Sequence, residues 1–239
     1  MSSPFLESHI YRRTKLDTIL KKMAVESIIN NPFETSAIIG ITGNIASGKS
    51  TMAIKLMQTY KTLFPDLHVQ TISTDNFLKK NSILKKENIF NKKGFPESYD
   101  QTLIDKFIDA IHTNSQIFLP VYDHQINDIV PDKKIFINQP DILIIEGLIV
   151  LQPDFYPLLN YSIFIDSSPS DNYEWFKQRC SKLKLQEAYH MNDKEFYSLM
   201  DYNWTSINLV NFNNHILPLK NLATRCIRLN VQHQIESLV

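Results

Sequence analysis

The segment GNIASGKST, residues 43–51, decides the fold of this 239-residue chain. It matches the pattern G-x-x-x-x-G-K-[ST]. It follows the apolar run SAIIGIT, residues 36–42, and it leads into residues 50–64, where apolar side chains recur at helical spacing. A strand, a glycine-rich loop and a helix in this order predict a phosphate-binding loop rather than a chance match in an unrelated turn.

The residue types in this loop suit a bound nucleotide. Glycine lets backbone N–H groups approach phosphate oxygens, and the start of the following helix adds partial positive charge. Lys49 is expected to reach the β- and γ-phosphates, and the Ser50 hydroxyl is expected to bind Mg²⁺. The sequence therefore predicts ATP and Mg²⁺ as cofactors. The expected nucleotide-binding residues are Gly43, Asn44, Ile45, Ala46, Ser47, Gly48, Lys49, Ser50 and Thr51.

The other periodic segments predict an α/β protein. Helical patterns cover residues 99–112 and most of 170–214, and residues 1–35 read as a helical arm packed on the rest. We expect a P-loop NTPase fold in one domain, residues 1–239, with a parallel sheet sandwiched by helices and a lid near 170–214. The further predicted strands are residues 68–73, 141–147, 161–166 and 224–231.

Composition argues against several classes of partner. Lys and Arg (25) balance Asp and Glu (25), so the chain has no overall field that would attract nucleic acid or an anionic membrane. Lysines interleaved with phenylalanines between residues 77 and 95 are typical of nucleic-acid binding, but the zero net charge argues against it. Without a signal peptide or an apolar run of about 20 residues, we expect no membrane partner and a cytoplasmic location. Cys180 and Cys226 have no CxxC partner, so we expect unpaired thiols.

Glycine is scarce, which limits the nucleotide-binding classes. Average usage would give roughly 17 glycines, and the chain has five. A GTPase needs D-x-x-G, yet no glycine here has Asp three residues before it, and a transport ATPase needs a second glycine-rich signature. A small-molecule kinase or a nucleotide-binding regulator remains. Gly94, within NKKGFPESYD at residues 91–100, is expected to let the chain bend into the next helix.

Two carboxylates are expected at the edge of the sheet where ligands bind. Asp75 follows the strand of residues 68–73, and Glu146 ends that of 141–147, so both belong to the carboxyl edge. Asp75 is the candidate base for an acceptor hydroxyl, and Glu146 is a candidate Mg²⁺ ligand through water. A turn or capping role for Asp75 and a structural ion pair for Glu146 stay open.

A basic segment follows the strand of residues 161–166. In kinases of this kind such a segment closes over the phosphates, and Arg179 is the candidate for stabilising the transferring group. A merely solvated face is the alternative. The basic residues are Lys177, Arg179, Lys182 and Lys184.

With these residues in place, the chain resembles the type I (bacterial) pantothenate kinases over residues 36–220. KKGFPESYD and QPDILIIEGL are specific to that family, whereas uridine kinases and phosphoribulokinases share only the loop. The motifs in family order are GNIASGKST, STDNFL, KKGFPESYD, PVYDH, IVPD, QPDILIIEGL and HILP.

The resemblance implies ATP-dependent phosphorylation of pantothenate to 4'-phosphopantothenate, the first step of coenzyme A synthesis, by a homodimer that coenzyme A inhibits. It implies catalytic roles for Asp75, Lys49 and Arg179, and metal binding by Ser50 and Glu146. The implied acceptor-binding residues are Asp75, Tyr122, His124, Phe176, Arg179 and Asn208.

Several positions depart from the family. Asn127 and Phe176 replace tyrosines, and Asn76 replaces a glycine, so the acceptor pocket is expected to differ while the phosphate machinery is intact. Cys180 and Leu183 replace aromatic residues that surround the thiol end of coenzyme A, so we expect weaker inhibition. A kinase of another small hydroxyl compound, such as a nucleoside, and a catalytically weak nucleotide-binding regulator remain alternatives.

Overall fold

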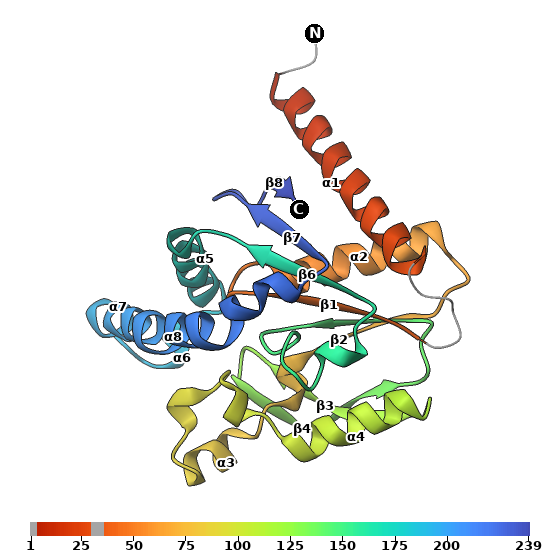
Figure 1. Cartoon of the computed structure of the whole chain (residues 1–239). Helices are drawn as coiled ribbons and strands as arrows, with labels where there is room; N and C mark the ends of the chain where they lie inside the picture. Colours follow the sequence, from red (N-terminus) through yellow and green to blue (C-terminus); the bar gives the residue numbers. More distant parts are fainter. Residues whose placement is uncertain (1–3, 30–35) are drawn as a thin grey trace.

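A six-stranded sheet forms the centre of the protein in the computed structural model, which describes residues 4–29 and 36–239 (Figure 1). The strand order is β2-β5-β1-β6-β7-β8, and neighbouring strands run parallel except for the antiparallel pair β7 and β8. The strands are β1 Ala37–Gly43, β2 Val69–Ser73, β5 Ile142–Glu146, β6 Tyr161–Asp166, β7 Arg225–Leu229 and β8 Ile235–Leu238. The expected α/β fold is confirmed.

Alternate residues of the apolar strands face opposite sides of the sheet, as the period of a strand requires. Ile39 and Ile144 lie in the core beneath α1 and α2, whereas Ile38 and Ile145 lie in the core beneath α4. Burial on both faces explains why these strands read as continuous apolar runs. The principal helices are α1 Pro4–Ile29, α2 Lys49–Leu63, α3 Asn81–Lys86, α4 Gln101–His112, α5 Pro169–Lys182, α6 Leu185–Ala188, α7 Asp193–Tyr202 and α8 Leu209–Asn211.

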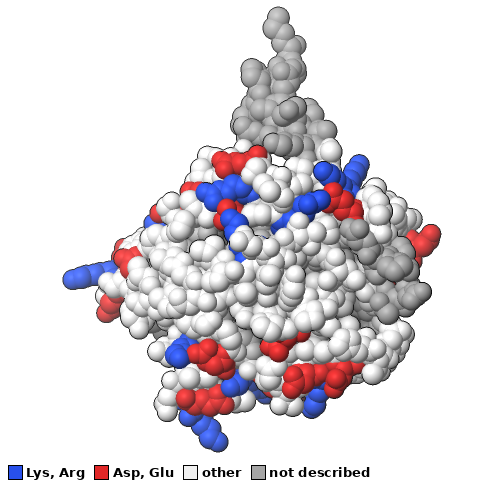
Figure 2. Space-filling view, in the orientation of Figure 1, with Lys and Arg blue, Asp and Glu red and all other residues white. Residues whose placement is uncertain are grey.

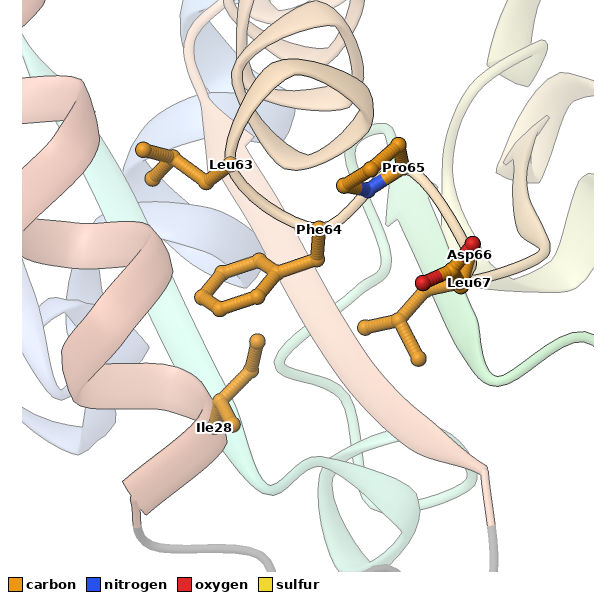
Figure 3. A pocket seen from close by; sticks show the side chains of 6 residues that line it. All are labelled: Ile28, Leu63, Phe64, Pro65, Asp66 and Leu67. Carbon is orange, nitrogen blue, oxygen red and sulfur yellow. The ribbon is translucent and has the colours of Figure 1, made fainter.

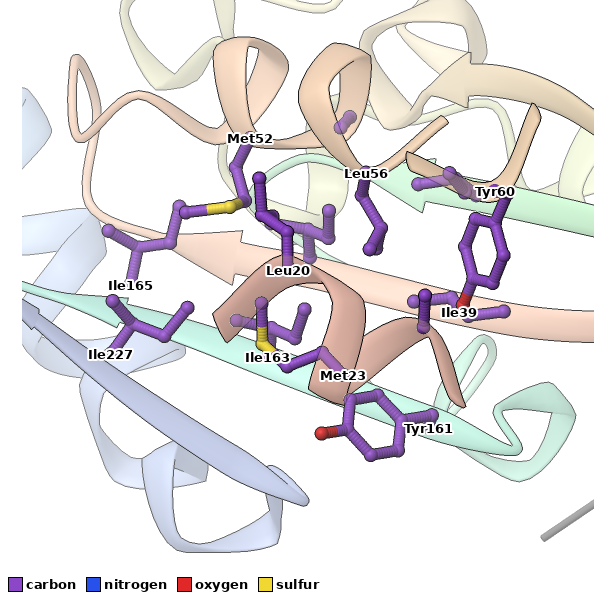
Figure 4. Packing of buried hydrophobic residues seen from close by; sticks show 14 of the residues in the cluster. Leu20, Met23, Ile39, Met52, Leu56, Tyr60, Tyr161, Ile163, Ile165 and Ile227 are labelled. Carbon is purple, nitrogen blue, oxygen red and sulfur yellow. The ribbon is translucent and has the colours of Figure 1, made fainter. Parts of the chain in front are cut away.

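The expected N-terminal arm packs on the sheet through the second half of α1. Leu20, Met23 and Ala24 are buried against α2 and β6, and Figure 4 shows Leu20 and Met23 among the sheet residues. Tyr161 donates a hydrogen bond to Glu26 at 2.9 Å, and the Arg225 guanidinium pairs with the same carboxylate at 3.2 Å. The remainder of the predicted arm, residues 1–3 and 30–35, lies outside the described part of the chain.

A β-hairpin that the sequence patterns did not predict lies beside β2. Strands β3 (Ile117–Asp123) and β4 (Asp128–Ile137) pair antiparallel, and Leu119 and Ile137 are buried in the core under α4. The side chain of Gln70 in β2 bonds to the backbone at Phe136 and Asn138, which fixes the hairpin against the main sheet. The hairpin thereby reaches the carboxyl edge of β2.

The lid region is helical, as expected, but part of it is wound as π-helix. The π segments are Asn203–Asn208 and Phe212–Ile216, on either side of α8. A separate apolar cluster holds this region to α5 and contains Phe176, Cys180, Phe196, Met200 and Trp204. Both cysteines are free thiols, as predicted.

Charges are mixed on the surface. On the face in Figure 2, basic and acidic side chains lie interspersed around a broad uncharged area. In the lysine-rich segment, Lys79 pairs with Glu87 at 2.8 Å and Lys92 with Glu97 at 2.9 Å. Within residues 4–29 and 36–239, no helix combines the length and the apolar character that crossing a bilayer requires.

A pocket of about 380 Å³ lies where the end of α1 meets the end of α2, lined by Ile28, Leu63, Phe64, Pro65, Asp66 and Leu67 (Figure 3). Because α2 has 15 residues, this pocket lies roughly 22 Å from the phosphate loop at the other end of the helix. It is therefore not the site of the predicted chemistry.

Candidate active site

The phosphate loop connects β1 to α2 and is fixed by its own glycines and by Asn44. Gly43 has φ +147°, and a Cβ there would lie 2.4 Å from the Ile165 carbonyl oxygen, so only glycine fits. Gly48 caps α2 at φ +89° with open space where a side chain would start. The Asn44 side chain accepts a bond from the Ile45 N–H at 2.7 Å and donates to Asn172 of α5 at 3.3 Å. The loop is thus held by contacts within the protein, with room beside Gly48 for a ligand.

The side chain of Lys49 folds back over the loop. Its Nζ donates to the Asn44 carbonyl oxygen at 2.8 Å. The pKa of Lys49 is lowered to about 8, mainly by burial. The negative charge of Glu146 raises this pKa, and the positive charge of Arg179 lowers it. An anion in the loop would favour the charged amine, so this lysine is suited to a phosphate ligand.

Ser50 and Glu146 place two oxygen ligands together beside the loop. Ser50 Oγ donates to Glu146 Oε1 at 3.0 Å, and burial raises the pKa of Glu146. The described residues hold no cluster of three His, Cys, Asp or Glu side chains suited to a metal. A hydroxyl and one carboxylate fit Mg²⁺, which takes its other ligands from phosphates and water.

Asp75 lies in a tight turn, Thr74–Phe77, directly after β2. Ser73 caps this turn by accepting a bond from the Asp75 N–H at 3.3 Å, so the carboxylate of Asp75 is not used as the cap. Burial raises the pKa of Asp75, while the charges of Lys49, Arg179 and Lys93 act in the opposite direction. The charges of these three cations therefore favour the ionised form of this carboxylate, whereas burial favours the protonated form.

The end of the β3–β4 hairpin brings His124 and Tyr122 to Asp75. His124 Nε2 lies 3.7 Å from Asp75 Oδ2. Burial, with the charge of Arg179, lowers the pKa of His124 to about 4, so the imidazole is neutral at pH 7. The Tyr122 ring meets that of His124 edge-on at 5.1 Å, and its hydroxyl donates to Asn127 Oδ1 at 2.7 Å.

The sequence patterns missed Lys93 as a site residue and placed it only in a lysine-rich run. Its Nζ donates to Asn81 Oδ1 at 2.7 Å and to the Asn127 carbonyl oxygen, and it lies 4.8 Å from the centre of the Tyr122 ring. Burial lowers its pKa to about 8. The available signal was its place next to Gly94, one of the few glycines of the chain.

Among the basic residues of the lid, Arg179 acts on the candidate site, whereas Lys177 and Lys184 form ion pairs within the lid. The charge of Arg179 shifts the pKa values of Lys49, Asp75 and His124, so its guanidinium is within electrostatic reach of all three. In the same segment Lys177 pairs with Glu174, and Lys184 with Glu187.

Two further predicted acceptor residues, Phe176 and Asn208, belong to the lid. The Phe176 ring is buried in the lid cluster, 5.9 Å from the Trp204 ring, so in this structure it serves as packing surface. Asn208 is half-buried in the first π segment. Three residues later, Asn211 Nδ2 donates to the Gly94 carbonyl oxygen at 2.8 Å.

Known proteins are similar to this chain in sequence and in fold. A profile of the Phosphoribulokinase / Uridine kinase family matches residues 38–180. A pantothenate kinase of Latilactobacillus sakei is 37% identical over 227 residues, covering 87% of this chain and 72% of that protein. A pantothenate kinase of Streptococcus pneumoniae (strain JJA) is 34% identical over 251 residues, covering 96% and 79%.

Solved structures agree on the architecture. D-glycerate 3-kinase from Cryptococcus neoformans has a TM-score of 0.68 at 13% identity, covering 95% of this chain and 98% of that one. A possible uridine kinase from Bacillus stearothermophilus has a TM-score of 0.52 at 20% identity, covering 76% and 96%. These likenesses concern the fold, whereas the sequence matches define the family. The chain is therefore a kinase of the phosphoribulokinase / uridine kinase family and belongs, within it, to the group of proteins named pantothenate kinase.

Proposed function

We propose that this kinase transfers the γ-phosphoryl group of ATP to the primary hydroxyl of pantothenate and so forms 4'-phosphopantothenate, the first step of coenzyme A biosynthesis. The observation that carries the proposal is the position of Asp75, which lies at the sheet edge of the phosphate loop and is electrostatically coupled to Lys49. The relatives named pantothenate kinase support this choice of acceptor.

The phosphate loop would hold ATP, and Ser50 with Glu146 would hold Mg²⁺. When bound, Mg²⁺ neutralises charge on the β- and γ-phosphates. Lys49 and Arg179 add two positive charges on the protein side of the transferred group. Because these charges are already in place, they stabilise the negative charge of the transition state without the reorganisation that water molecules would need.

Asp75 would act as the base. Its carboxylate takes the proton of the acceptor hydroxyl. At the same time the hydroxyl oxygen of the acceptor bonds to the γ-phosphorus, and the bond from the γ-phosphorus to the bridging oxygen of ADP breaks. The neutral imidazole of His124 lies 3.7 Å from Asp75 and can accept or donate a hydrogen bond at the same hydroxyl. Because it is uncharged, it does not form an ion pair with the Asp75 carboxylate. The burial that raises the pKa of Asp75 makes it a stronger base.

The acceptor would lie against Tyr122, His124 and Lys93. Pantothenate is an anion, and Lys93 supplies a half-buried positive charge on this side of the site. Phe176 and Asn208 remain predicted acceptor contacts. For Phe176 such a contact requires the lid to move, because the ring is buried in the lid cluster.

Coenzyme A would be a weak inhibitor. Cys180 and Leu183 stand at the positions where the family has aromatic residues. Cys180 is a small buried thiol, and burial raises its pKa to about 11. Leu183 lies at the end of α5. Neither provides the aromatic contact surface expected for a thiol ligand. Strong competition between coenzyme A and ATP in steady-state assays would contradict this expectation. A homodimer is likewise proposed from the family.

A different acceptor is favoured by one observation. Asn127 replaces a tyrosine and accepts the hydroxyl hydrogen bond of Tyr122, which changes the polar surface offered to the acceptor. An ATP-consumption assay with pantothenate, pantetheine and nucleosides separates the possibilities. Turnover with pantothenate supports the proposal, turnover only with another compound supports the second acceptor, and nucleotide binding without turnover supports a regulator.

A further inference from the structure

Asn211 connects two segments that are far apart in sequence and both border the acceptor side. It is the last residue of α8, between the two π segments, and it is only 4% exposed. Its Nδ2 donates to the carbonyl oxygen of Gly94 at 2.8 Å. A second contact links the neighbouring residues: the Phe95 ring meets the His215 ring edge-on, with 5.6 Å between the ring centres.

The Gly94 carbonyl is presented to Asn211 by a turn that needs glycine. Gly94 has φ +92°, and a Cβ there would approach Leu148 Cδ1 to 3.4 Å. The Gly94 N–H donates to Ser98 Oγ at 2.9 Å, and that hydroxyl donates to the Phe95 carbonyl oxygen at 2.7 Å. Residues 91–100, which we name the acceptor loop, are thus fixed internally and then tied to α8 by one amide.

Lys93 directly precedes this tie, so the position of its amine depends on it. Lys93 Nζ bonds to Asn81 and to the Asn127 carbonyl oxygen and lies over the Tyr122 ring. These contacts come from α3 and from the hairpin, whereas the hydrogen bond from Asn211 ties the loop to α8 in the lid region. The acceptor loop is therefore in contact both with the hairpin, which carries Tyr122, and with α8, which directly follows Asn208.

We propose that Asn211 is a positioning residue for the phosphoryl acceptor: its amide holds the Gly94 carbonyl, and the acceptor loop in turn holds Lys93 beside Tyr122 and Asp75. The description of this side as the acceptor side rests on the proposed function, but the link between α8 and the loop does not. Asn211 acts through the loop and does not touch the reacting atoms.

The chemistry of the contact distinguishes this role from simple packing. The amide nitrogen donates to Gly94, whereas the buried amide oxygen has no hydrogen-bond partner among the described residues. Burying a polar atom without a partner is costly, and an apolar side chain would fill the same volume without that cost. The donor is therefore the property of Asn211 that matters.

Asn211→Asp tests the donor directly because it keeps the shape. Once ionised, the introduced carboxyl group cannot donate, and it would face the Gly94 carbonyl oxygen; when protonated, it can donate. Burial raises the pKa of such a group above its ordinary value of about 3.9. We expect a KM for pantothenate about tenfold above wild type at pH 8 that recovers toward wild type as the pH falls to about 5.5, with the KM for ATP within twofold throughout. Asn211→Ala should lose the contact at every pH.

Asn213→Asp is the matched control, since Asn213 lies exposed two residues further on, in the second π segment, and the change adds the same charge. It should leave both KM values unchanged. A pantothenate KM for Asn211→Asp that matches wild type at pH 8, or equal rises in the KM for ATP and for pantothenate, would overturn the proposal.

Hydrogen exchange of the full chain without substrate separates the link from the function. Amides of residues 91–98 should exchange about tenfold faster in Asn211→Ala than in wild type and in Asn213→Asp, as expected for the loss of one buried hydrogen bond. Unchanged exchange in the loop would overturn the positioning role. Faster exchange in a protein whose wild type does not phosphorylate pantothenate would support the link and contradict the proposed function instead.

Discussion

The phosphate side of the site comes from one continuous segment, whereas the acceptor side is assembled from separate ones. Residues 43–51 form the loop expected to hold the phosphates, Glu146 joins it from β5 through its bond with Ser50, and the charge of Arg179 reaches it from the lid. The acceptor side collects Asp75 after β2, Lys93 from the acceptor loop and His124 from the hairpin, and its loop is fixed from the lid by Asn211. A continuous loop carries its geometry in its own backbone, whereas an assembled surface depends on how distant elements pack.

This difference has a functional consequence. The phosphate loop is an intact match to its pattern, while the acceptor side carries Asn127 in place of the family tyrosine. A surface built from several elements can change one contact and keep the others, so it is the side on which acceptor preference would vary. Substitutions on the two sides should therefore affect different kinetic constants.

The largest separation is expected for Asp75→Asn. Loss of the base should lower kcat about a thousandfold, while nucleotide affinity stays within twofold because the phosphate cradle is untouched. Steady-state kinetics and titration with a non-hydrolysable ATP analogue measure the two effects. Asp109→Asn, at an exposed carboxylate of α4, is the control and should change neither. Retained activity in Asp75→Asn would place the base elsewhere.

Lys49→Met should affect the opposite side. Removing the amine should weaken nucleotide binding and lower kcat by about a hundredfold, because a fixed positive charge at the phosphates is lost. Binding of pantothenate without nucleotide, measured by calorimetry, should remain as in wild type. Lys61→Met, in the last turn of α2, provides a lysine control far from the loop. Equal loss of pantothenate binding would show that the two sides are not separate.

The pH dependence of nucleotide binding should report Lys49. Burial lowers its pKa to about 8 in the ligand-free protein. A bound phosphate favours the protonated amine, so affinity should fall by about half between pH 7 and 8 and by up to tenfold per pH unit above that. Lys49→Arg should remove this slope, because guanidinium stays charged. A slope that survives in Lys49→Arg would assign the titration to another group.

Asn127→Gly is expected to change only the acceptor side, and modestly. Asn127 has φ +52°, which glycine adopts freely, so the substitution removes the side-chain acceptor of the Tyr122 hydroxyl without straining the backbone. The KM for pantothenate should rise about fivefold, the value of one hydrogen bond. Asn88→Gly, at an exposed asparagine with φ +58°, is the control for the same backbone conformation. A change in the KM for ATP alone would contradict the assignment.

The smallest effect is expected outside both sides, at the anchor of α1. Glu26→Gln keeps an acceptor for the Tyr161 hydroxyl but removes the charge paired with Arg225, so stability should fall by less than about 1 kcal/mol. The bond from Arg225 holds the pKa of Glu26 below its ordinary value, so this stabilisation is present at neutral pH and is lost as the pH falls through the folded-state pKa. Thermal unfolding at pH 7 measures it, and altered kinetics would contradict it.

The sequence predicted best what is local. The strand, loop and helix around residues 43–51 follow from apolar patterning and glycine placement, and Asp75 and Glu146 follow from the rule that ligands bind at the carboxyl edge of a parallel sheet. The hairpin was missed because Pro120 and Pro131 interrupt its strands and because an exposed Lys133–Lys134 pair hides the alternation of β4.

The roles of Lys93 and Asn211 could not be predicted in this way. Each depends on partners more than thirty residues distant, Asn127 for Lys93 and Gly94 for Asn211. The same limit applies to Phe176, whose place in the lid cluster could not be read from its position in the sequence. Sequence patterns record spacing along the chain, and these contacts depend on packing between elements.

The most direct test of the account is the product of the wild-type reaction. The purified chain is incubated with ATP, Mg²⁺ and pantothenate, and the product is identified by ³¹P NMR and mass spectrometry. The proposed function predicts a phosphate monoester on the primary hydroxyl of pantothenate, formed in equal amount to ADP. Release of ADP without phosphorylated pantothenate, or phosphorylation of a competing nucleoside in its place, would contradict it.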